Sequence, residues 1–217
     1  MAGKLSSSVP HSQLKTVAED SAALNVIIDT PKGSRNKYKF DEALGLFKLG
    51  GVLPAGAVFP FDFGYLPSTL GGDGDPLDVL LLMDEPAFVG CLVESRLIGV
   101  IEAEQTKDEV TERNDRLIAV AANARTHKHI RSLSQLDTTL LDEIEHFFIS
   151  YNEAKNKVFK PLDRSGPRRA QELVKEGEKL FRRENSKPAS KAGKRKSARP
   201  KKQSVGRGRK ASGSDKA

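Results

Sequence analysis

The apolar segments of this 217-residue chain are short and closely spaced, and no other feature constrains its fold as much. These segments are Leu77–Met83, Val89–Val93, Leu97–Ile101 and Leu117–Val120. Gly, Pro and Asp residues separate the segments, and no long helical pattern lies between them. Short strands at this spacing are typical of barrels, whereas a doubly wound sheet requires a helix between successive parallel strands. The sequence therefore predicts a mainly β body that resembles a barrel.

The period of the apolar residues changes after Asp137, which is a suitable helix N-cap. Six residues then follow the spacing of one helix face: Leu140, Leu141, Ile144, Phe147, Phe148 and Tyr151. A second helical pattern begins at Pro167, where the missing N–H of proline costs little. Because the helices follow the strands, we expect the α+β class.

Composition divides the chain into three predicted parts. Residues 1–20 are polar and aperiodic, which is typical of a flexible lead-in, and residues 21–181 have enough apolar sequence for one core. Residues 182–217 contain 14 basic and 2 acidic residues, a net charge of +12 within a chain total of +7. We expect this tail to be disordered, because Val205 is its only large apolar residue after Ser186.

Cysteine content and hydropathy indicate the compartment. A single cysteine, Cys91, excludes an internal disulfide and a cysteine metal cluster. No segment approaches the roughly 18 apolar residues of a membrane span, and the polar opening lacks the apolar region of a signal peptide. The sequence therefore predicts a soluble, cytoplasmic protein without membrane contact.

The densest polar feature, Gly71–Asp78, leads directly into the apolar run Val79–Met83. Its carboxylates, Asp73, Asp75 and Asp78, would repel one another beside a buried strand, and a hard cation such as Mg²⁺ relieves that repulsion. A plain polar turn is the alternative, because Asp, Gly and Pro are ordinary turn residues. Asp78 argues against it, since strand alternation places this carboxylate on an apolar face.

Together with the aromatic strand Phe63-Gly64-Tyr65, this stretch resembles the soluble inorganic pyrophosphatase family. The hallmark of that family is Asp-x-Asp-Pro-x-Asp after a Tyr-Gly-Tyr-like strand. Further similar segments are Val26–Pro31, Lys37–Tyr38, Leu97–Val100, Asp115–Val120 and His146–Tyr151. The resemblance implies a closed, OB-like, five-stranded β-barrel with C-terminal helices packed outside it. It also implies a homo-oligomer that hydrolyses pyrophosphate to two orthophosphates by a metal-bridged water, with several Mg²⁺ ions per site, for which Mn²⁺ or Zn²⁺ could substitute.

The resemblance also implies roles for individual residues. Asp75 would orient or deprotonate the attacking water. The metal ligands would be Asp73, Asp78, Glu104, Asp115, Asn114 and Asp29, and the phosphate oxygens would be held by Lys37, Tyr65, Arg116 and Tyr151. At the metal site, either Asn114 is a weak ligand or the register shifts to the adjacent Asp115.

Several positions depart from the family pattern. Lys39 and Asp29 stand where the family has Glu, Gly51 replaces a phosphate-binding Arg, and Asn152 replaces the Lys after Tyr151. Lys48 is the nearby basic residue that would compensate for Gly51. These departures motivate an alternative hypothesis, a weakly active or inactive module that binds nucleic acid or polyphosphate through residues 182–217, since such charge suffices for sequence-neutral phosphate binding.

Overall fold

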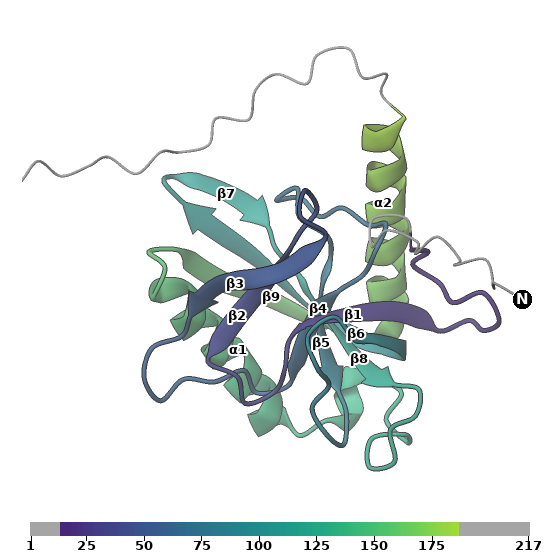
Figure 1. The fold of residues 1–217 in the computed structure, drawn as a ribbon. Helices are drawn as coiled ribbons and strands as arrows, with labels where there is room; N and C mark the ends of the chain where they lie inside the picture. Colours follow the sequence, from purple (N-terminus) through teal and green to yellow (C-terminus); the bar gives the residue numbers. More distant parts are fainter. Residues whose placement is uncertain (1–13, 187–217) are drawn as a thin grey trace, which may run out of the picture. The chain divides into compact units, whose positions relative to one another are not determined.

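The computed structural model describes residues 14–186, within which strands precede and flank two long helices (Figure 1). The strands are β1 (Leu24–Thr30), β2 (Asn36–Asp41), β3 (Leu46–Val52), β4 (Asp62–Tyr65), β5 (Asp78–Leu82), β6 (Leu92–Lys107), β7 (Val110–Arg113), β8 (Arg116–Ala121) and β9 (Val158–Ser165). The helices are η2 (Leu133–Gln135), α1 (Thr138–Glu153) and α2 (Pro167–Asn185). The predicted α+β, mainly β character is confirmed.

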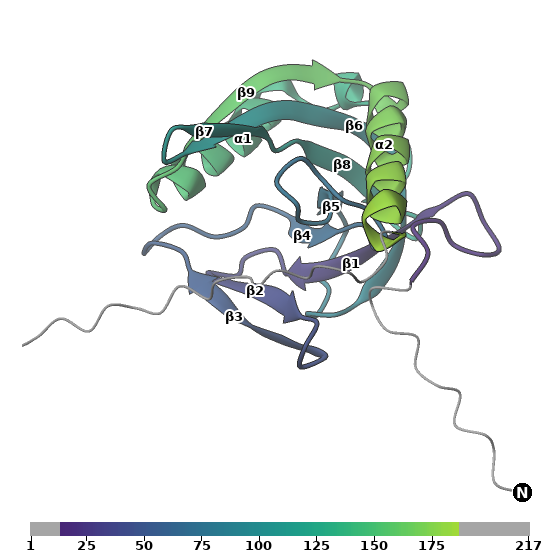
Figure 2. The same cartoon turned by 90° about the horizontal axis from the view of Figure 1, so that it is seen from above.

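Strand pairing arranges seven strands in one mixed sheet. The hydrogen-bonded order is β1-β4-β5-β8-β6-β7, β9 pairs with β6, and β1 pairs back with β6. The pairings β1-β4-β5-β8-β6-β1 therefore form a ring of strands, in which β5 and β8 are parallel and the other neighbours are antiparallel. Strands β2 and β3 form a separate hairpin beside the main sheet (Figure 2).

The hydrophobic core explains why the central strands read as continuous apolar runs. Val79 to Leu82 of β5 and every residue of β8 are buried, because both faces of these strands are covered. Helix α1 contributes Ile144 and Phe148, each 1% exposed, to the same core. The core thus holds rigid the strands that begin at Asp78 and Arg116.

Both helices begin where the sequence predicts. The Asp137 carboxylate accepts a hydrogen bond from the Thr139 backbone N–H at 2.7 Å, and Pro167 opens α2. Helix α1 contacts β9, and α2 contacts β6 (Figure 2). Helix α2 continues to Asn185, past the predicted boundary at Phe181. Neither helix of the described residues is long and apolar enough to cross a membrane.

Three elements differ from what the sequence patterns indicate. Strand β6 is continuous, although Val89–Val93 and Leu97–Ile101 look like two segments, because pairing with β1, β8 and β9 carries it through the polar residues between them. Strands β3 and β9 are not evident in the sequence, since both are largely exposed and β9 contains Pro161. Only their hydrogen-bonded partners hold them extended.

The two predicted terminal segments are only partly described. Within the lead-in, Thr16 is 3% exposed and its hydroxyl donates to the Pro67 carbonyl at 2.9 Å. Val17 forms an isolated bridge with Leu24. Residues 1–13 and 187–217, which include nearly all of the predicted basic tail, lie outside the described residues.

Candidate active site

The loop between β4 and β5 is a compact turn that presents carboxylates. The Gly71 N–H donates to the Asp75 carbonyl at 2.8 Å, and the Asp75 N–H donates to the Asp73 carboxylate at 3.1 Å. Gly74 has φ of +80°, a left-handed conformation that favours glycine. The loop therefore holds Asp73 and Asp75 at defined positions just before Asp78 begins β5.

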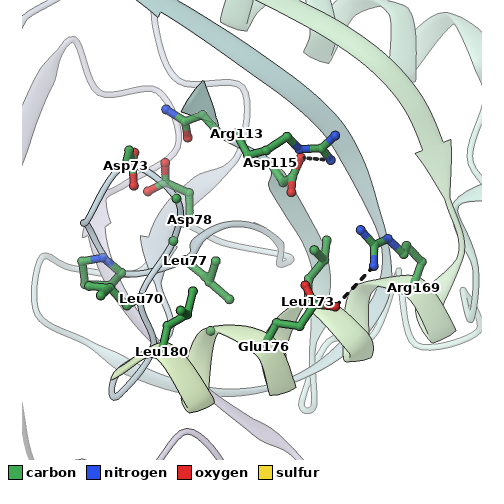
Figure 3. A pocket seen from close by; sticks show the side chains of 15 residues that line it. Leu70, Asp73, Leu77, Asp78, Arg113, Asp115, Arg169, Leu173, Glu176 and Leu180 are labelled. Carbon is green, nitrogen blue, oxygen red and sulfur yellow. Dashed lines mark hydrogen bonds and ion pairs between the residues drawn. The ribbon is translucent and has the colours of Figure 1, made fainter. Parts of the chain in front are cut away.

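A pocket of about 180 Å³ lies between this loop, the link from β7 to β8, and α2 (Figure 3). Asp73, Asp78 and Asp115 line it on one side, and Leu173 and Leu180 of α2 line the other. The pocket thus joins carboxylates from two separate segments to apolar side chains of α2. The two clustered carboxylates of the sequence motif and the distant Asp115 are brought together here only by the fold.

Arg116 is the buried cation of the site. It is 3% exposed, and its Nη1 lies 2.9 Å from Asp78 Oδ2. The same nitrogen donates to the side-chain oxygen of Asn114, and the guanidinium lies 4.9 Å from the Phe148 ring centroid. Its Nε is buried without a hydrogen-bond partner among the described residues. Arg116 therefore neutralises Asp78 while keeping one donor uncommitted.

Burial and neighbouring negative charges raise the pKa of Asp73 in the acidic loop. Burial first, and then the neighbouring charges of Asp78 and Asp75, raise the pKa of Asp73, opposed by the hydrogen bond from the Asp75 backbone. Asp75 itself is exposed and pairs with Lys39, whose Nζ lies 3.1 Å and 3.3 Å from the two carboxylate oxygens. Lys39, which stands where the family has an acid, thus contacts the residue predicted to be the base.

Lys37 and Asp29 form a second charged pair, on β2 and β1. Lys37 Nζ lies 4.0 Å from Asp29 Oδ2 and 4.3 Å from the Phe63 ring centroid. Burial raises the pKa of Asp29 to about 6, although the Lys37 charge and a 2.6 Å hydrogen bond from the Thr30 hydroxyl oppose this. Burial likewise raises the pKa of Tyr65, whose backbone pairs with that of Asp78. These side chains lie on the strands next to the acidic loop.

Asp115 is held by contacts that the sequence does not reveal. Its Oδ1 accepts from the Ala103 backbone N–H at 2.9 Å and from Arg113 Nη2 at 2.7 Å. Arg113 also bonds Glu102, which Arg169 of α2 contacts at 3.4 Å. Both Asn114 and Asp115 line the pocket, whereas Glu104, which pairs with Arg113 and Lys160 across the sheet, is not among its lining residues.

The positions that depart from the family pattern have distinct surroundings. No atom lies within 4 Å of where a Gly51 side chain would begin, and Lys48 pairs instead with Asp41 at 2.5 Å. Lys48 therefore does not compensate for the missing arginine in this structure. Asn152 is 2% exposed and donates to the Phe148 carbonyl at 2.8 Å, so it faces the core.

Lys155 is a cation of the site that the sequence motifs did not identify. Its Nζ donates to the Tyr151 hydroxyl and lies 3.8 Å from the centroid of that ring. The available signal was its position four residues after Tyr151, a spacing that brings two side chains together near the end of a helix, although Lys155 itself lies in the turn after α1.

The carboxylates do not form a complete cation site by themselves. Among residues 14–186, no three His, Cys, Asp or Glu side chains converge closely enough to hold a metal ion. Arg116, Lys39 and Arg113 pair with Asp78, Asp75 and Asp115. Carboxylate oxygens are nevertheless the ligands that Mg²⁺ prefers, and Asp73, Asp78 and Asp115 face one pocket.

Comparison with known proteins places the chain in a family. Residues 26–182 match the family model described as inorganic pyrophosphatase. The chain is 39% identical to an inorganic pyrophosphatase of Synechocystis sp. over 62% of its own length and 78% of that protein. It is 36% identical to one of Nostoc sp. over 73% of its length and 92% of that protein. The crystal structure of inorganic pyrophosphatase from Thermus thermophilus superposes with a TM-score of 0.73 at 31% identity, covering 80% of this chain and 99% of that one. The match over most of the described residues, in sequence and in fold, shows that this chain belongs to the inorganic pyrophosphatase family.

Proposed function

We propose that this protein hydrolyses inorganic pyrophosphate to two orthophosphates in a reaction that requires a divalent metal. One observation carries the proposal: in a member of the inorganic pyrophosphatase family, the carboxylates of Asp73, Asp78 and Asp115 line one pocket beside the cation Arg116. Carboxylates that hold metal ions, next to fixed cations, suit a polyanionic substrate because attack on it requires charge neutralisation.

Mg²⁺ is the metal that fits these residues best, with Mn²⁺ or Zn²⁺ as substitutes. Asp73, Asp78 and Asp115 would hold it, and the pKa of Asp73, raised first by burial and then by the charges of Asp78 and Asp75, indicates a carboxylate that a bound cation would stabilise. When bound, Mg²⁺ supplies charge neutralisation of the phosphate oxygens and a water of lowered pKa. Asn114, which also lines the pocket, would be a further ligand, as would Asp29 and Glu104, which are not among the lining residues.

Asp75 would accept the proton of the attacking water. The water oxygen forms a bond to one phosphorus atom, the bond from that phosphorus to the bridging oxygen breaks, and the bridging oxygen leaves with the second phosphate. Lys39 pairs with Asp75 at 3.1 Å in the structure, so it must release this carboxylate during turnover. A pyrophosphate anion offers Lys39 an alternative partner, which would free Asp75 as substrate binds.

Lys37, Tyr65, Arg116 and Tyr151 would hold the phosphate oxygens. Lys37 retains charge in a largely apolar setting beside Phe63, and Arg116 keeps its buried Nε uncommitted among the described residues. Such donors bind phosphate through charge-assisted hydrogen bonds. We also propose that the ring of strands is a closed, OB-like barrel, whose rigidity would keep these side chains in place.

A phosphate-release assay on the full-length protein tests the proposal. Wild-type protein should release phosphate from pyrophosphate only with Mg²⁺, Mn²⁺ or Zn²⁺. Asp75→Asn and Asp78→Asn should each lower kcat by about 100-fold or more, the usual contribution of a general base or a metal ligand. Asp108→Asn, an acid whose side chain is 88% exposed in the β6–β7 turn, is the matched control and should retain activity. No phosphate release with any of the three metals would refute the function.

A further inference from the structure

The end of α1 places an uncommitted ammonium beside the phosphate-binding side chains. Lys155 Nζ donates to the Tyr151 hydroxyl and lies 3.8 Å from its ring centroid. Lys37 Nζ lies 5.9 Å from the same centroid, so two ammonium groups lie within 6 Å of one tyrosine ring. Tyr151 is itself fixed by ring contacts with Phe59 and Phe147. The fold therefore places both Lys155 and Lys37 near one fixed aromatic residue.

The backbone after α1 holds Lys155 in this position. The helix ends at Glu153, and the N–H groups of Lys155 and Lys157 both donate to the Asn152 carbonyl, at 2.8 Å and 3.0 Å. Asn156 has φ of +56°, which reverses the chain towards β9. These two hydrogen bonds and the left-handed conformation of Asn156 define the backbone conformation of the turn that carries Lys155.

The electrostatic surroundings of Lys155 are strongly positive. Partial burial and the charges of Lys37, Lys157 and Arg116 lower the pKa of Lys155 to about 8, and the negative charge of Asp78 opposes them only weakly. The other two cations of the site have carboxylate partners, Asp29 for Lys37 and Asp78 for Arg116. Lys155 forms no such ion pair with any carboxylate of residues 14–186.

Cations crowded together without a full set of anions favour the binding of an anion, because each unneutralised charge raises the free energy of the empty site. We propose that Lys155 is a phosphate-binding residue, which with the Tyr151 hydroxyl holds one phosphoryl group of the substrate. This assignment rests on the proposed function and deepens it. Lys155 then supplies a positive charge in the region where Asn152, turned into the core, supplies none.

Three substitutions separate this role from a general effect of charge. Lys155→Met removes the ammonium and keeps the apolar stem, Lys155→Arg keeps the charge, and Lys157→Met removes a charge two residues away in the same turn. The readouts are the Kd of methylenediphosphonate, a pyrophosphate analogue that cannot be hydrolysed, measured by calorimetry with Mg²⁺, and the KM for pyrophosphate. Thermal midpoints confirm that each variant is folded.

Lys155→Met should raise the Kd of the analogue and the KM for pyrophosphate about 10- to 100-fold, the effect of losing one charge-assisted hydrogen bond. Lys155→Arg and Lys157→Met should stay within about threefold of wild type. Equal losses in Lys155→Met and Lys157→Met, or a Lys155→Met Kd within about twofold of wild type, would overturn the assignment. Absence of hydrolysis in wild-type protein would overturn the proposed function instead, and the analogue Kd would still decide the role of Lys155.

Discussion

At the scale of single residues, the carboxylates of the site differ in the cationic side chain with which each one pairs. Asp78 meets a buried arginine, Asp75 an exposed lysine, and Asp29 a largely buried lysine at the limit of an ion pair. Ion pairs between exposed groups contribute about 0 to 1 kcal/mol, whereas removing a partner from a buried pair costs several times more. The Lys39–Asp75 pair is therefore the contact that a substrate anion can displace most easily.

Replacing Lys39 tests whether the Lys39–Asp75 ion pair forms only in the absence of substrate and contributes nothing to the chemical step. Lys39→Met should change kcat by less than about fivefold, since breaking an exposed ion pair costs about 1 kcal/mol or less. The KM for pyrophosphate should rise several-fold, because one positive charge near the substrate is lost. Steady-state kinetics with saturating Mg²⁺ would measure both. A fall in kcat as large as that of Asp75→Asn would instead mean that Lys39 positions the base.

Asp29 gives a prediction about pH and stability. Its pKa of about 6 in the folded protein lies above the ordinary 3.8, so the folded state binds the proton more tightly than the unfolded state does. The stabilisation is complete below about pH 4 and is lost as pH rises through about 6, a change of about 3 kcal/mol. Urea unfolding of metal-free protein should show this loss in wild type and a flatter profile in Asp29→Asn. The same slope in both proteins would contradict the assignment, and Asp108→Asn serves as the control.

At the scale of elements, α2 supports the acidic loop from behind. The Leu70 N–H donates to the Gly177 carbonyl at 3.1 Å, and Gly177 packs against Leu77 in the same loop. A Cβ atom on Gly177 would lie 2.8 Å from Leu77 Cδ1 and 3.2 Å from the Leu70 carbonyl oxygen. A side chain at this position would therefore require Leu77 and the Leu70 backbone to shift, because the loop that carries Asp73 and Asp75 rests directly on the helix.

Gly177→Ala tests this support. In an exposed helix the change would stabilise by about 1 kcal/mol, but here the clash should destabilise the protein by about 1 to 3 kcal/mol. Displacement of the loop should also lower kcat. Urea unfolding and phosphate release would measure the two effects, with Lys179→Ala on the exposed face of α2 as the control. A more stable and fully active Gly177→Ala protein would show that the loop does not depend on the helix.

At the scale of the whole molecule, the strongly basic segment and the residues assigned to the site lie in different parts of the chain. The family match ends at residue 182 and the described structure at Ser186, while residues 187–217 contain 12 basic residues and 1 acidic residue. All the side chains assigned to the site lie between Asp29 and Lys155. Formation of a homo-oligomer stays a prediction, for which exposed apolar residues of the β2–β3 hairpin, such as Leu46, Leu49 and Val52, are candidate contacts.

A chain that ends at Ser186 should therefore keep kcat and KM within about twofold of the full-length values, because it retains every side chain assigned to the site. If the tail binds nucleic acid, the full-length protein should bind DNA with an affinity that falls steeply with salt, and the shortened chain should lose that affinity. Fluorescence anisotropy at several salt concentrations would measure this. Unchanged DNA affinity and salt dependence after truncation would exclude a role for the tail.

The mainly β body, the two C-terminal helices and their first residues were predictable from the sequence, because apolar periodicity, an Asp N-cap and a helix-initiating Pro are local signals. The cluster from Asp73 to Asp78 was also evident locally, as its residues are adjacent in the chain. Strands β3 and β9 were not predictable, since pairing with partners distant in sequence holds them extended.

Only the tertiary structure decided which charges meet. The sequence places Lys39 and Asp75 36 residues apart, and local patterns contain no information about such a contact. Likewise, the fold turned Asn152 into the core and brought Lys37 near the ring of Tyr151. The sequence by itself determined the chemical class of the site, because residue types set the available ligands and charges. The tertiary structure decided their pairing, since electrostatic interactions depend on distance and burial, which the order of residues does not specify.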